Sequence, residues 1–208
     1  MENNLFPERT DLQEFREILN RLRSEIGKVI VGQEQMIELL IAGILADGHV
    51  LIEGEPGVDK TLTAKLLSCT ISVGFSRIQF TPDLMPGDVI GTSVFNPREL
   101  VFQFREGPIF SHIVLIDEIN RAPAKPQAAL FEVMEERQIT VDGQTMEMQQ
   151  PFLVIATQNP VEQEGTYHLP EAQLDRFLFK IKVDYPNAEE EFQVLTRNHA
   201  GKSSHPEE

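Results

Sequence analysis

Two patterns of apolar and polar residues recur along the chain, one typical of helices and one typical of buried strands. Together they predict an α/β fold. Leu12, Phe15, Leu19, Leu22 and Ile26 recur at three- and four-residue spacing, which predicts one face of a helix. Short runs rich in Ile, Val and Leu predict buried strands. Strands that alternate with helices indicate a parallel sheet with helices on both faces. We expect strands over 49–52, 77–80, 111–117, 152–157 and 179–183, and further helices over 33–46, from 61, over 123–136 and 171–177, and from 187.

Two stretches depart from this alternation. Residues 81–110 are rich in Pro and Gly, and we expect a loop with short hairpin strands at 91–95 and 100–104 that turns over Asn96-Pro97. A segment of this length without a regular core element indicates a functional insertion. Residues 138–148 alternate around Asp142-Gly143, which predicts a hairpin with a two-residue turn.

Charge and cysteine content narrow the class of protein. The 208 residues carry 33 Asp+Glu against 18 Lys+Arg, a formal net charge of −15, which argues against a general nucleic-acid binder. The single cysteine, Cys69, lies among apolar residues, and we expect a buried, unreactive thiol. The five histidines show no metal-ligand spacing. The start of the chain does not resemble a signal peptide, and no apolar segment is long enough to span a bilayer, so we expect a cytoplasmic protein.

The candidate chemistry begins where the first predicted strand ends. The stretch HVLIEGEPGVDKT, residues 49–61, places a Gly- and Pro-containing turn between a strand and a helix start, which forms an anion site. The phosphate-loop pattern G-x-x-x-x-G-K-[ST] is met at Gly54, Lys60 and Thr61, but Asp59 occupies the place of the second glycine. Lys60 could reach terminal phosphates, and the Thr61 hydroxyl could bind Mg²⁺. The alternative is a chance surface turn.

Polar residues also follow two later strands. Asp117 and Glu118 follow four aliphatic residues; Asp117 could hold Mg²⁺, and Glu118 could orient a water or act as a general base. The alternative is that this pair only caps a turn. Asn159 could bridge the attacking water and the terminal phosphate, or could simply be a turn residue before Pro160. Arg121 or Arg176 could stabilise transition-state charge in a neighbouring subunit, although a surface arginine is usually structural.

These motifs together give the chain a family resemblance. It resembles the ATPase domain of MoxR-type AAA+ proteins, the group that includes the magnesium-chelatase ATPase subunits. The resemblance covers nearly all of residues 29–191. The matching stretches are VIVGQE, GHVLIEGEPGVDKT, RIQFTPDLMPGDVIGT, GPIF, VLIDEINRAPAKPQAALFEVMEERQITVDG, FLVIATQNPVEQEGTYHLPEAQLDRF and YPNAEEE.

The resemblance implies roles for individual residues. Asp117 and Glu118 are implied to be Walker B, Asn159 sensor 1, and Arg176 an arginine finger acting in the adjacent subunit. Val31 and Gly32 are implied to lie near the adenine. The implied Walker A loop, which with Leu62 contacts the nucleotide, consists of Gly54, Glu55, Pro56, Gly57, Val58, Asp59, Lys60 and Thr61.

The resemblance also implies an architecture and partners. It implies a phosphate-loop AAA+ core over 29–186, with an insertion in the second core helix and a hairpin before sensor 1 that face substrates or partners. We also expect an N-terminal helix over 1–28 to pack on this core, and residues 187–208 to form the start of a truncated lid or linker and a disordered tail. Relatives of this type bind ATP and Mg²⁺, form hexameric rings and work as chaperone-like ATPases with partners that carry von Willebrand factor A domains.

The sequence departs from the family pattern in two respects. Asp59 adds a Cβ and a negative charge beside a polyanion, which we expect to weaken nucleotide binding without abolishing it. The chain stops near Glu208, where relatives continue into a helical lid that supplies the sensor 2 arginine, so we expect poor self-assembly. Three readings follow: an ATPase that remodels a protein partner, a nucleotide-binding scaffold subunit with impaired hydrolysis, and, disfavoured by the charge, a nucleic-acid motor.

Overall fold

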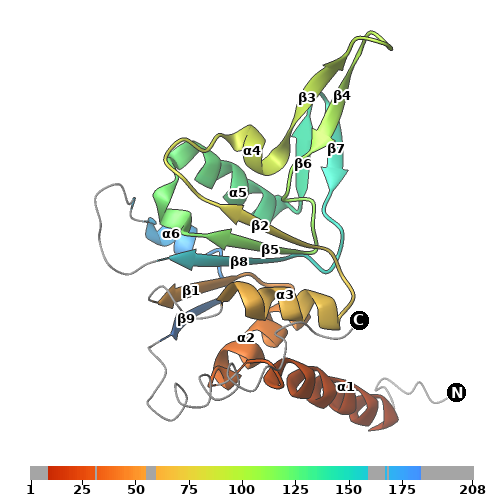
Figure 1. Ribbon diagram of the computed structural model, residues 1–208, viewed down its shortest axis with the longest axis vertical. Helices are drawn as coiled ribbons and strands as arrows, with labels where there is room; N and C mark the ends of the chain where they lie inside the picture. The colour runs from red at the N-terminus through yellow and green to blue at the C-terminus, as the bar shows by residue number, and fades with distance from the viewer. Residues whose placement is uncertain (1–8, 31, 55–59, 159–166, 168, 184–208) are drawn as a thin grey trace, which may run out of the picture.

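The computed structural model describes residues 9–30, 32–54, 60–158, 167 and 169–183, with the backbone alone for 9–12. The predicted helix from 187 lies outside these residues. Figure 1 shows a sheet with helices on both sides and two hairpins that extend beyond it. The helices are α1 (Arg9–Gly27), α2 (Glu34–Leu45), α3 (Lys60–Thr70), α4 (Pro86–Ile90), α5 (Ala124–Glu136) and α6 (Glu171–Leu174), with a 3-10 turn at Ile119–Arg121.

The central sheet has five parallel strands, as the sequence predicts. Its order is β2-β5-β8-β1-β9, so that β1 lies between β8 and β9 and β2 forms one edge. The strands are β1 (Val50–Gly54), β2 (Phe75–Gln79), β5 (Ile113–Asp117), β8 (Leu153–Gln158) and β9 (Phe179–Val183). Every neighbouring pair is parallel, so all five carboxyl ends lie along the same side of the sheet.

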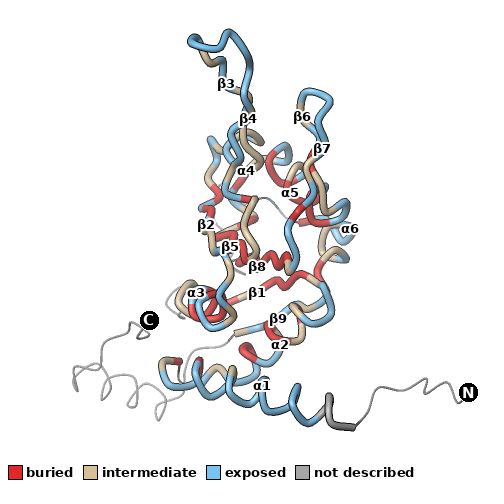
Figure 2. Tube along the Cα trace, turned by 90° about the vertical axis from the view of Figure 1, so that its right-hand side faces the viewer, coloured by how far each residue is buried: buried red, intermediate tan, exposed pale blue. Residues whose placement is uncertain are grey.

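Each face of the sheet has its own hydrophobic core. Figure 2 shows buried residues concentrated along the central strands. Alternate residues of β5 divide between them: Val114 and Ile116 face α5, while Ile113 and Leu115 face α2 and α3. This follows from the two-residue period of a strand. Both faces of β5 are covered by these cores, which explains why the strand is a continuous run of aliphatic residues up to Asp117.

The segment 81–110 contains more regular structure than predicted. It forms the antiparallel hairpin of β3 (Gly91–Asn96) and β4 (Val101–Glu106), close to the predicted strands, but it begins with the short helix α4, which we predicted as loop. Pro86 stands in the first turn of α4, and the Asp88 carboxylate accepts a hydrogen bond from the Met85 N–H at 2.8 Å. A single helical turn that includes Pro and Gly has no periodicity to detect, which is why the sequence reads as loop.

The second predicted hairpin is confirmed. Strands β6 (Gln138–Val141) and β7 (Gln144–Glu147) pair across Asp142 and Gly143, which have φ of 52° and 78°. These are the positive values that a two-residue hairpin turn requires. The Ser93 hydroxyl donates a hydrogen bond to the Asp142 carboxylate, so β3 contacts the turn of this hairpin.

Helix α1 packs on the core through its C-terminal half. Ile26 is buried, and Leu19 and Leu22 pack against the core on the α2–α3 side, whereas Phe15 is 44% exposed. The predicted apolar face therefore splits into a packed part and a solvent-exposed part. Within the described residues, no helix combines the length and the apolar character needed to cross a membrane.

The prediction of a buried Cys69 is wrong, because this thiol is exposed. Helix α3 buries Thr63, Ala64, Leu66 and Leu67 against the sheet. Cys69 follows Leu67 by two positions, which turns its side chain about 200° around the helix axis and onto the outer face. Apolar neighbours in the sequence were a poor guide, since they occupy the other face.

His49 is a buried polar residue directly before β1. It is 3% exposed; its Nδ1 accepts a hydrogen bond from the Val154 N–H at 3.0 Å, and its Nε2 lies 3.2 Å from the Met134 carbonyl oxygen. The neutral ring with its proton on Nε2 satisfies both contacts. Burial, and then the nearby positive charge of Arg137, lower the pKa of His49 from 6.5 to about 4.

His49 should make folding stability depend on pH. Because its pKa is lower in the folded than in the unfolded chain, the unfolded chain takes up the proton first as the pH falls. We expect the free energy of unfolding to fall between pH 6.5 and 4, with His49 contributing a loss of about 3 kcal/mol. Urea unfolding across this range, read relative to each protein's own value at pH 7, should give a flatter profile for His49→Gln. His112→Gln, at a partly exposed site, is the control, and equal slopes for wild type and His49→Gln would contradict the assignment.

Candidate nucleotide-binding site

The candidate site lies at the carboxyl ends of the parallel strands, where ligands of open α/β sheets bind. Strand β1 ends at Gly54, β5 at Asp117 and β8 at Gln158, and these three strands are adjacent in the sheet. The sequence predicts these three ends from their polar residues. Their adjacency comes from the strand order.

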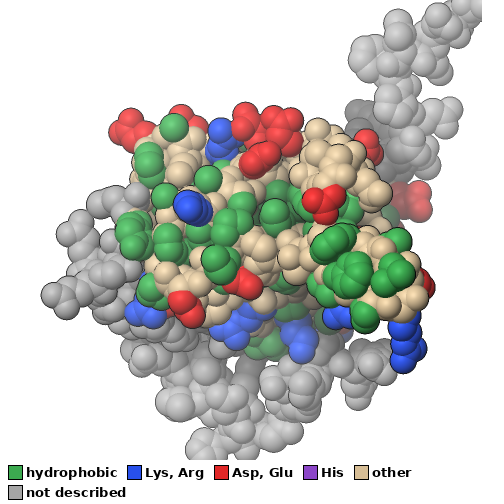
Figure 3. Space-filling view, turned by 90° about the horizontal axis from the view of Figure 1, so that it is seen from above, with side chains coloured by type: hydrophobic (Ala, Val, Ile, Leu, Met, Phe, Trp, Pro, Cys, Tyr) green, Lys and Arg blue, Asp and Glu red, His purple; other side chains and the backbone are tan. Residues whose placement is uncertain are grey.

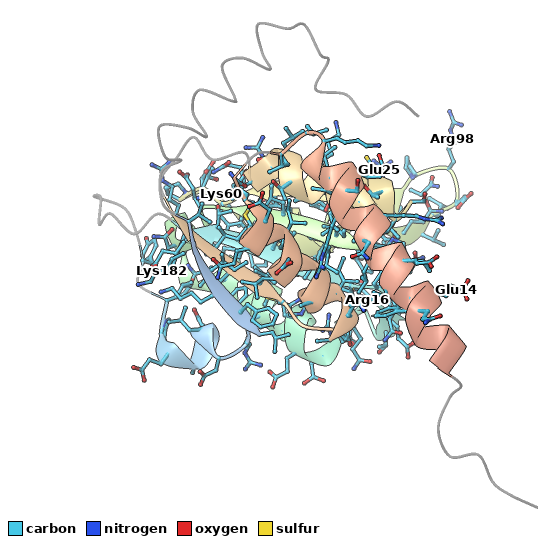
Figure 4. All side chains as sticks on the ribbon, turned by 90° about the horizontal axis from the view of Figure 1, so that it is seen from below. Glu14, Arg16, Glu25, Lys60, Arg98 and Lys182 are labelled. Atoms are coloured by element: carbon cyan, nitrogen blue, oxygen red, sulfur yellow. The ribbon has the colours of Figure 1, made fainter. Side chains whose placement is uncertain are left out.

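Gly54 and Lys60 mark the two ends of the predicted phosphate loop. Lys60 begins α3, and its Nζ donates a hydrogen bond to the Gly54 carbonyl oxygen at 2.8 Å. Lys60 thus lies at the end of β1 (labelled in Figure 4). Five predicted nucleotide contacts between them lie outside the described residues: Glu55, Pro56, Gly57, Val58 and Asp59.

Gly54 is required for packing as well as for the loop. A Cβ built on it would lie 2.5 Å from the carbonyl oxygen of Val183 on β9, which is closer than real Cβ atoms approach. A main-chain atom cannot move aside as a flexible side chain can, so this position excludes larger residues. The phosphate-loop pattern predicts the glycine, but not this reason for it.

Thr61 and Leu62 occupy the first turn of α3. Thr61 is partly buried, and Leu62 packs against the core beneath the helix. The side chain of Leu62 is therefore structural, and contact with a ligand would come from its backbone. The N-terminal turn of a helix presents unpaired N–H groups, which suits phosphate.

Asp117 and Glu118 are fixed by the backbone and by Thr157 of β8. Asp117 is 9% exposed at the end of β5. Glu118 has a left-handed backbone with φ of 55°, unusual for a residue other than glycine. Its N–H donates to the Thr157 hydroxyl at 3.0 Å, and that hydroxyl donates to Asp117 Oδ1 at 3.5 Å. Such strained positions cluster at functional sites.

The carboxylate of Glu118 is held by two donors. Gln79 at the end of β2 donates from Nε2 to Glu118 Oε2 at 3.1 Å, and Arg121 lies 3.1 Å from the same oxygen. The sequence analysis did not identify Gln79. Gln79 lies within reach of Glu118 because the register between β2 and β5 sets it opposite Asp117.

Asp117 has an ion-pair partner that the sequence analysis also missed. Arg77 of β2 donates from Nε to Asp117 Oδ2 at 2.5 Å. Arg77 and Gln79 stand two residues apart, so they share one face of β2, and each reaches one of the two acids. A charged residue within a predicted strand is the signal that could have identified it.

A second polar cluster, centred on Glu53, lies near the carboxyl end of β1. Glu53 accepts a hydrogen bond from Gln158 at 2.8 Å and pairs with Lys180 of β9 at 3.1 Å. Burial opposes ionisation here, but these two partners keep the pKa of Glu53 below its usual value. Glu53 is therefore an anchored anion between β8, β1 and β9.

Arg176 lies apart from the other predicted site residues. It pairs with Glu135 of α5 beside a pocket lined by Met134, Ala172 and Asp175. Gly32 has a positive φ of 73°, which glycine adopts without strain; its predicted place near the adenine stays a prediction. Val31 and Asn159, predicted near the adenine and as sensor 1, lie outside the described residues.

The donors at this site fit Mg²⁺. Within the described residues no three His, Cys, Asp or Glu side chains gather into a metal cluster. Mg²⁺ bound with a nucleotide does not need one, because phosphate and water supply most of its oxygen ligands. A largely buried Asp117 carboxylate and the Thr61 hydroxyl are hard oxygen donors of the required kind.

Comparisons with known proteins agree with this geometry. Residues 49–179 match the family described as ATPase family associated with various cellular activities (AAA). The protein YeaC of Bacillus subtilis is 50% identical over 194 residues, which cover 93% of this chain and 60% of that protein. Chaperone MoxR1 of Mycobacterium tuberculosis is 52% identical over 179 residues, which cover 86% of this chain and 48% of that protein.

A solved structure shares the fold. A crystal structure of a protein assigned as an ATPase from Cytophaga hutchinsonii superposes with a TM-score of 0.83 at 49% identity. The match covers 91% of this chain and 58% of that one. The chain thus spans only about half to three fifths of the length of these relatives. With the sheet order, the strand-end acids and these matches in agreement, the chain belongs to the MoxR family of AAA+ ATPases.

Proposed function

We propose that this chain binds ATP with Mg²⁺ and hydrolyses it to drive chaperone-like remodelling or assembly of a protein partner. The observation that carries the proposal is the placement of Lys60 at the end of β1 and of Asp117 and Glu118 at the end of β5, on either side of β8 at the same edge of the sheet. A cation for phosphate, a carboxylate for the metal and a second carboxylate for water are the parts that phosphoryl transfer needs.

Each residue has a defined part in this proposal. Lys60 neutralises the terminal phosphates, and Thr61 and Asp117 hold Mg²⁺, which when bound neutralises charge on the transferring phosphate. Glu118 orients the attacking water and accepts its proton. Asn159 positions that water as sensor 1. Arg176 acts in the site of an adjacent subunit, which requires it to leave Glu135.

The partner-facing part of the proposal rests on the hairpin β3–β4. This hairpin stands at the far end of the molecule from α1 (Figure 1), and Figure 3 shows hydrophobic side chains gathered over this end. We propose that a hexameric ring presents these hairpins to a protein that carries a von Willebrand factor A domain. A relative named Chaperone MoxR1 supports a chaperone-like role. The exposed residues are Val94, Phe95, Leu100, Val101 and Phe102.

Asp59 supports a second candidate function. A carboxylate in place of the last phosphate-loop glycine repels a nucleotide. In this alternative the chain is a nucleotide-binding scaffold subunit with impaired hydrolysis, which depends on active neighbours.

One experiment separates the two candidates. The chain is titrated with ATP, and phosphate release is followed with Mg²⁺ and with EDTA. Binding and Mg²⁺-dependent release support the ATPase. Binding without release supports the scaffold. No binding in either condition contradicts both.

A further inference from the structure

The ion pair between Arg77 and Asp117 joins the edge of the sheet to the centre of the candidate site. Arg77 comes from β2, whose single partner among the described strands is β5. Its Nε lies 2.5 Å from Asp117 Oδ2. The Arg77 side chain is 53% exposed and that of Asp117 is 13% exposed. The acid is therefore enclosed, whereas the arginine has open space into which it can swing.

Both oxygens of this carboxylate already have partners. Thr157 approaches Oδ1 at 3.5 Å, which is a long contact, and Arg77 holds Oδ2 at close range. A guanidinium and a divalent cation on the same carboxylate repel each other. Arg77 and a metal ion therefore compete for this carboxylate.

We propose that Arg77 is a positioning residue that holds Asp117 as an ion pair and sets how much Mg²⁺ is needed to load nucleotide. The inference rests on the proposed nucleotide binding. In this arrangement Arg77 substitutes for the metal's positive charge, keeps the enclosed carboxylate oriented, and competes with the metal for it.

The competition has a limited size. Because Arg77 is half exposed, water screens its attraction to Asp117. Removal of the Arg77 guanidinium should therefore tighten metal binding by about 3- to 10-fold. Arg77 also adds positive charge near the phosphates. Removing it should therefore leave metal-free nucleotide binding unchanged or weaker. Tighter metal binding and weaker metal-free nucleotide binding both raise the same ratio. This is the nucleotide dissociation constant in EDTA divided by that in saturating Mg²⁺.

The test measures the Mg²⁺ dependence of nucleotide binding, without turnover. A fluorescent ADP is titrated onto the chain in EDTA and at increasing Mg²⁺, for wild type, Arg77→Met, Arg77→Lys and Arg98→Met. Arg98→Met is the matched control, since Figure 4 places Arg98 on the opposite side of the molecule from Lys60. We expect Arg77→Met to need about 3- to 10-fold less Mg²⁺ at half saturation, Arg77→Lys to lie nearer wild type, and Arg98→Met to match it.

The outcomes distinguish this inference from the proposed function. The inference is overturned, and the proposed function stands, if wild type binds nucleotide and Arg77→Met reaches half saturation at a Mg²⁺ concentration within twofold of wild type. A higher Mg²⁺ requirement for Arg77→Met has the same meaning. If Arg77→Met melts at a lower temperature but keeps the Mg²⁺ dependence of wild type, the ion pair has a purely structural role. That result also overturns the inference. If wild type binds no nucleotide, the proposed function fails and the inference with it.

Discussion

Replacing Glu118 by glutamine should lower ATP turnover by about a hundredfold or more while nucleotide affinity stays within about threefold. The left-handed backbone at Glu118 and its contacts with Gln79 and Arg121 fix the direction of this carboxylate. Glutamine keeps the size and one acceptor oxygen, so these contacts can persist. It cannot accept a proton from water, which removes the proposed general base. Phosphate release and ADP titration on the same preparation measure the two quantities.

The control for this variant is Glu136→Gln. Glu136 is exposed at the end of α5, and the same loss of charge there should change neither quantity. A turnover within tenfold of wild type for Glu118→Gln would count against Glu118 as the base. It would leave the binding roles of Lys60 and Asp117 open to separate measurement.

Replacing Asp59 by glycine should tighten ATP binding by up to about a hundredfold, because one charge repulsion at ~5 Å with an effective dielectric of about 20 is on the order of 3 kcal/mol. Asp59 directly precedes Lys60, the cation proposed to bind the phosphates. Lys60 and Mg²⁺ offset part of the repulsion, so the hundredfold figure is an upper value. ATP titration by calorimetry, at one fixed Mg²⁺ concentration, measures the change.

Two further variants separate the causes of this effect. Asp59→Asn removes the charge and keeps the Cβ, so its share of the gain is the electrostatic part. Asp142→Gly is the matched control, since Asp142 has a positive φ that glycine tolerates and lies in the β6–β7 turn. An unchanged dissociation constant for Asp59→Gly would mean that Asp59 does not repel the nucleotide.

Local patterns predicted the elements that depend on local chemistry. The aliphatic run of β5 and the Asp142-Gly143 turn carry their structure in a few consecutive residues, and both are confirmed. Helix α4 was missed because one turn has no period. Cys69 was wrongly placed because neighbours along a helix do not share its face.

The candidate site likewise contains residues that the sequence predicts and residues that it does not. The motif residues Lys60, Asp117 and Glu118 follow from strand ends and spacing. The contacts of Arg77 and Gln79 could not be predicted, since they depend on the register between β2 and β5. A register is set by packing across the whole sheet and has no local sequence pattern. The residues that surround the reacting groups were therefore the hardest to predict.

The close approach of Gly54 to Val183 has a mechanical consequence. Gly54 starts the phosphate loop, and Val183 is the last residue of β9, so the two backbones touch where one segment enters the site and the other leaves the core. With no side chain between them to absorb movement, a shift of the loop acts directly on the end of β9. A displacement of Gly54 would therefore be felt at the end of β9, which links the start of the predicted nucleotide loop to an edge strand of the sheet.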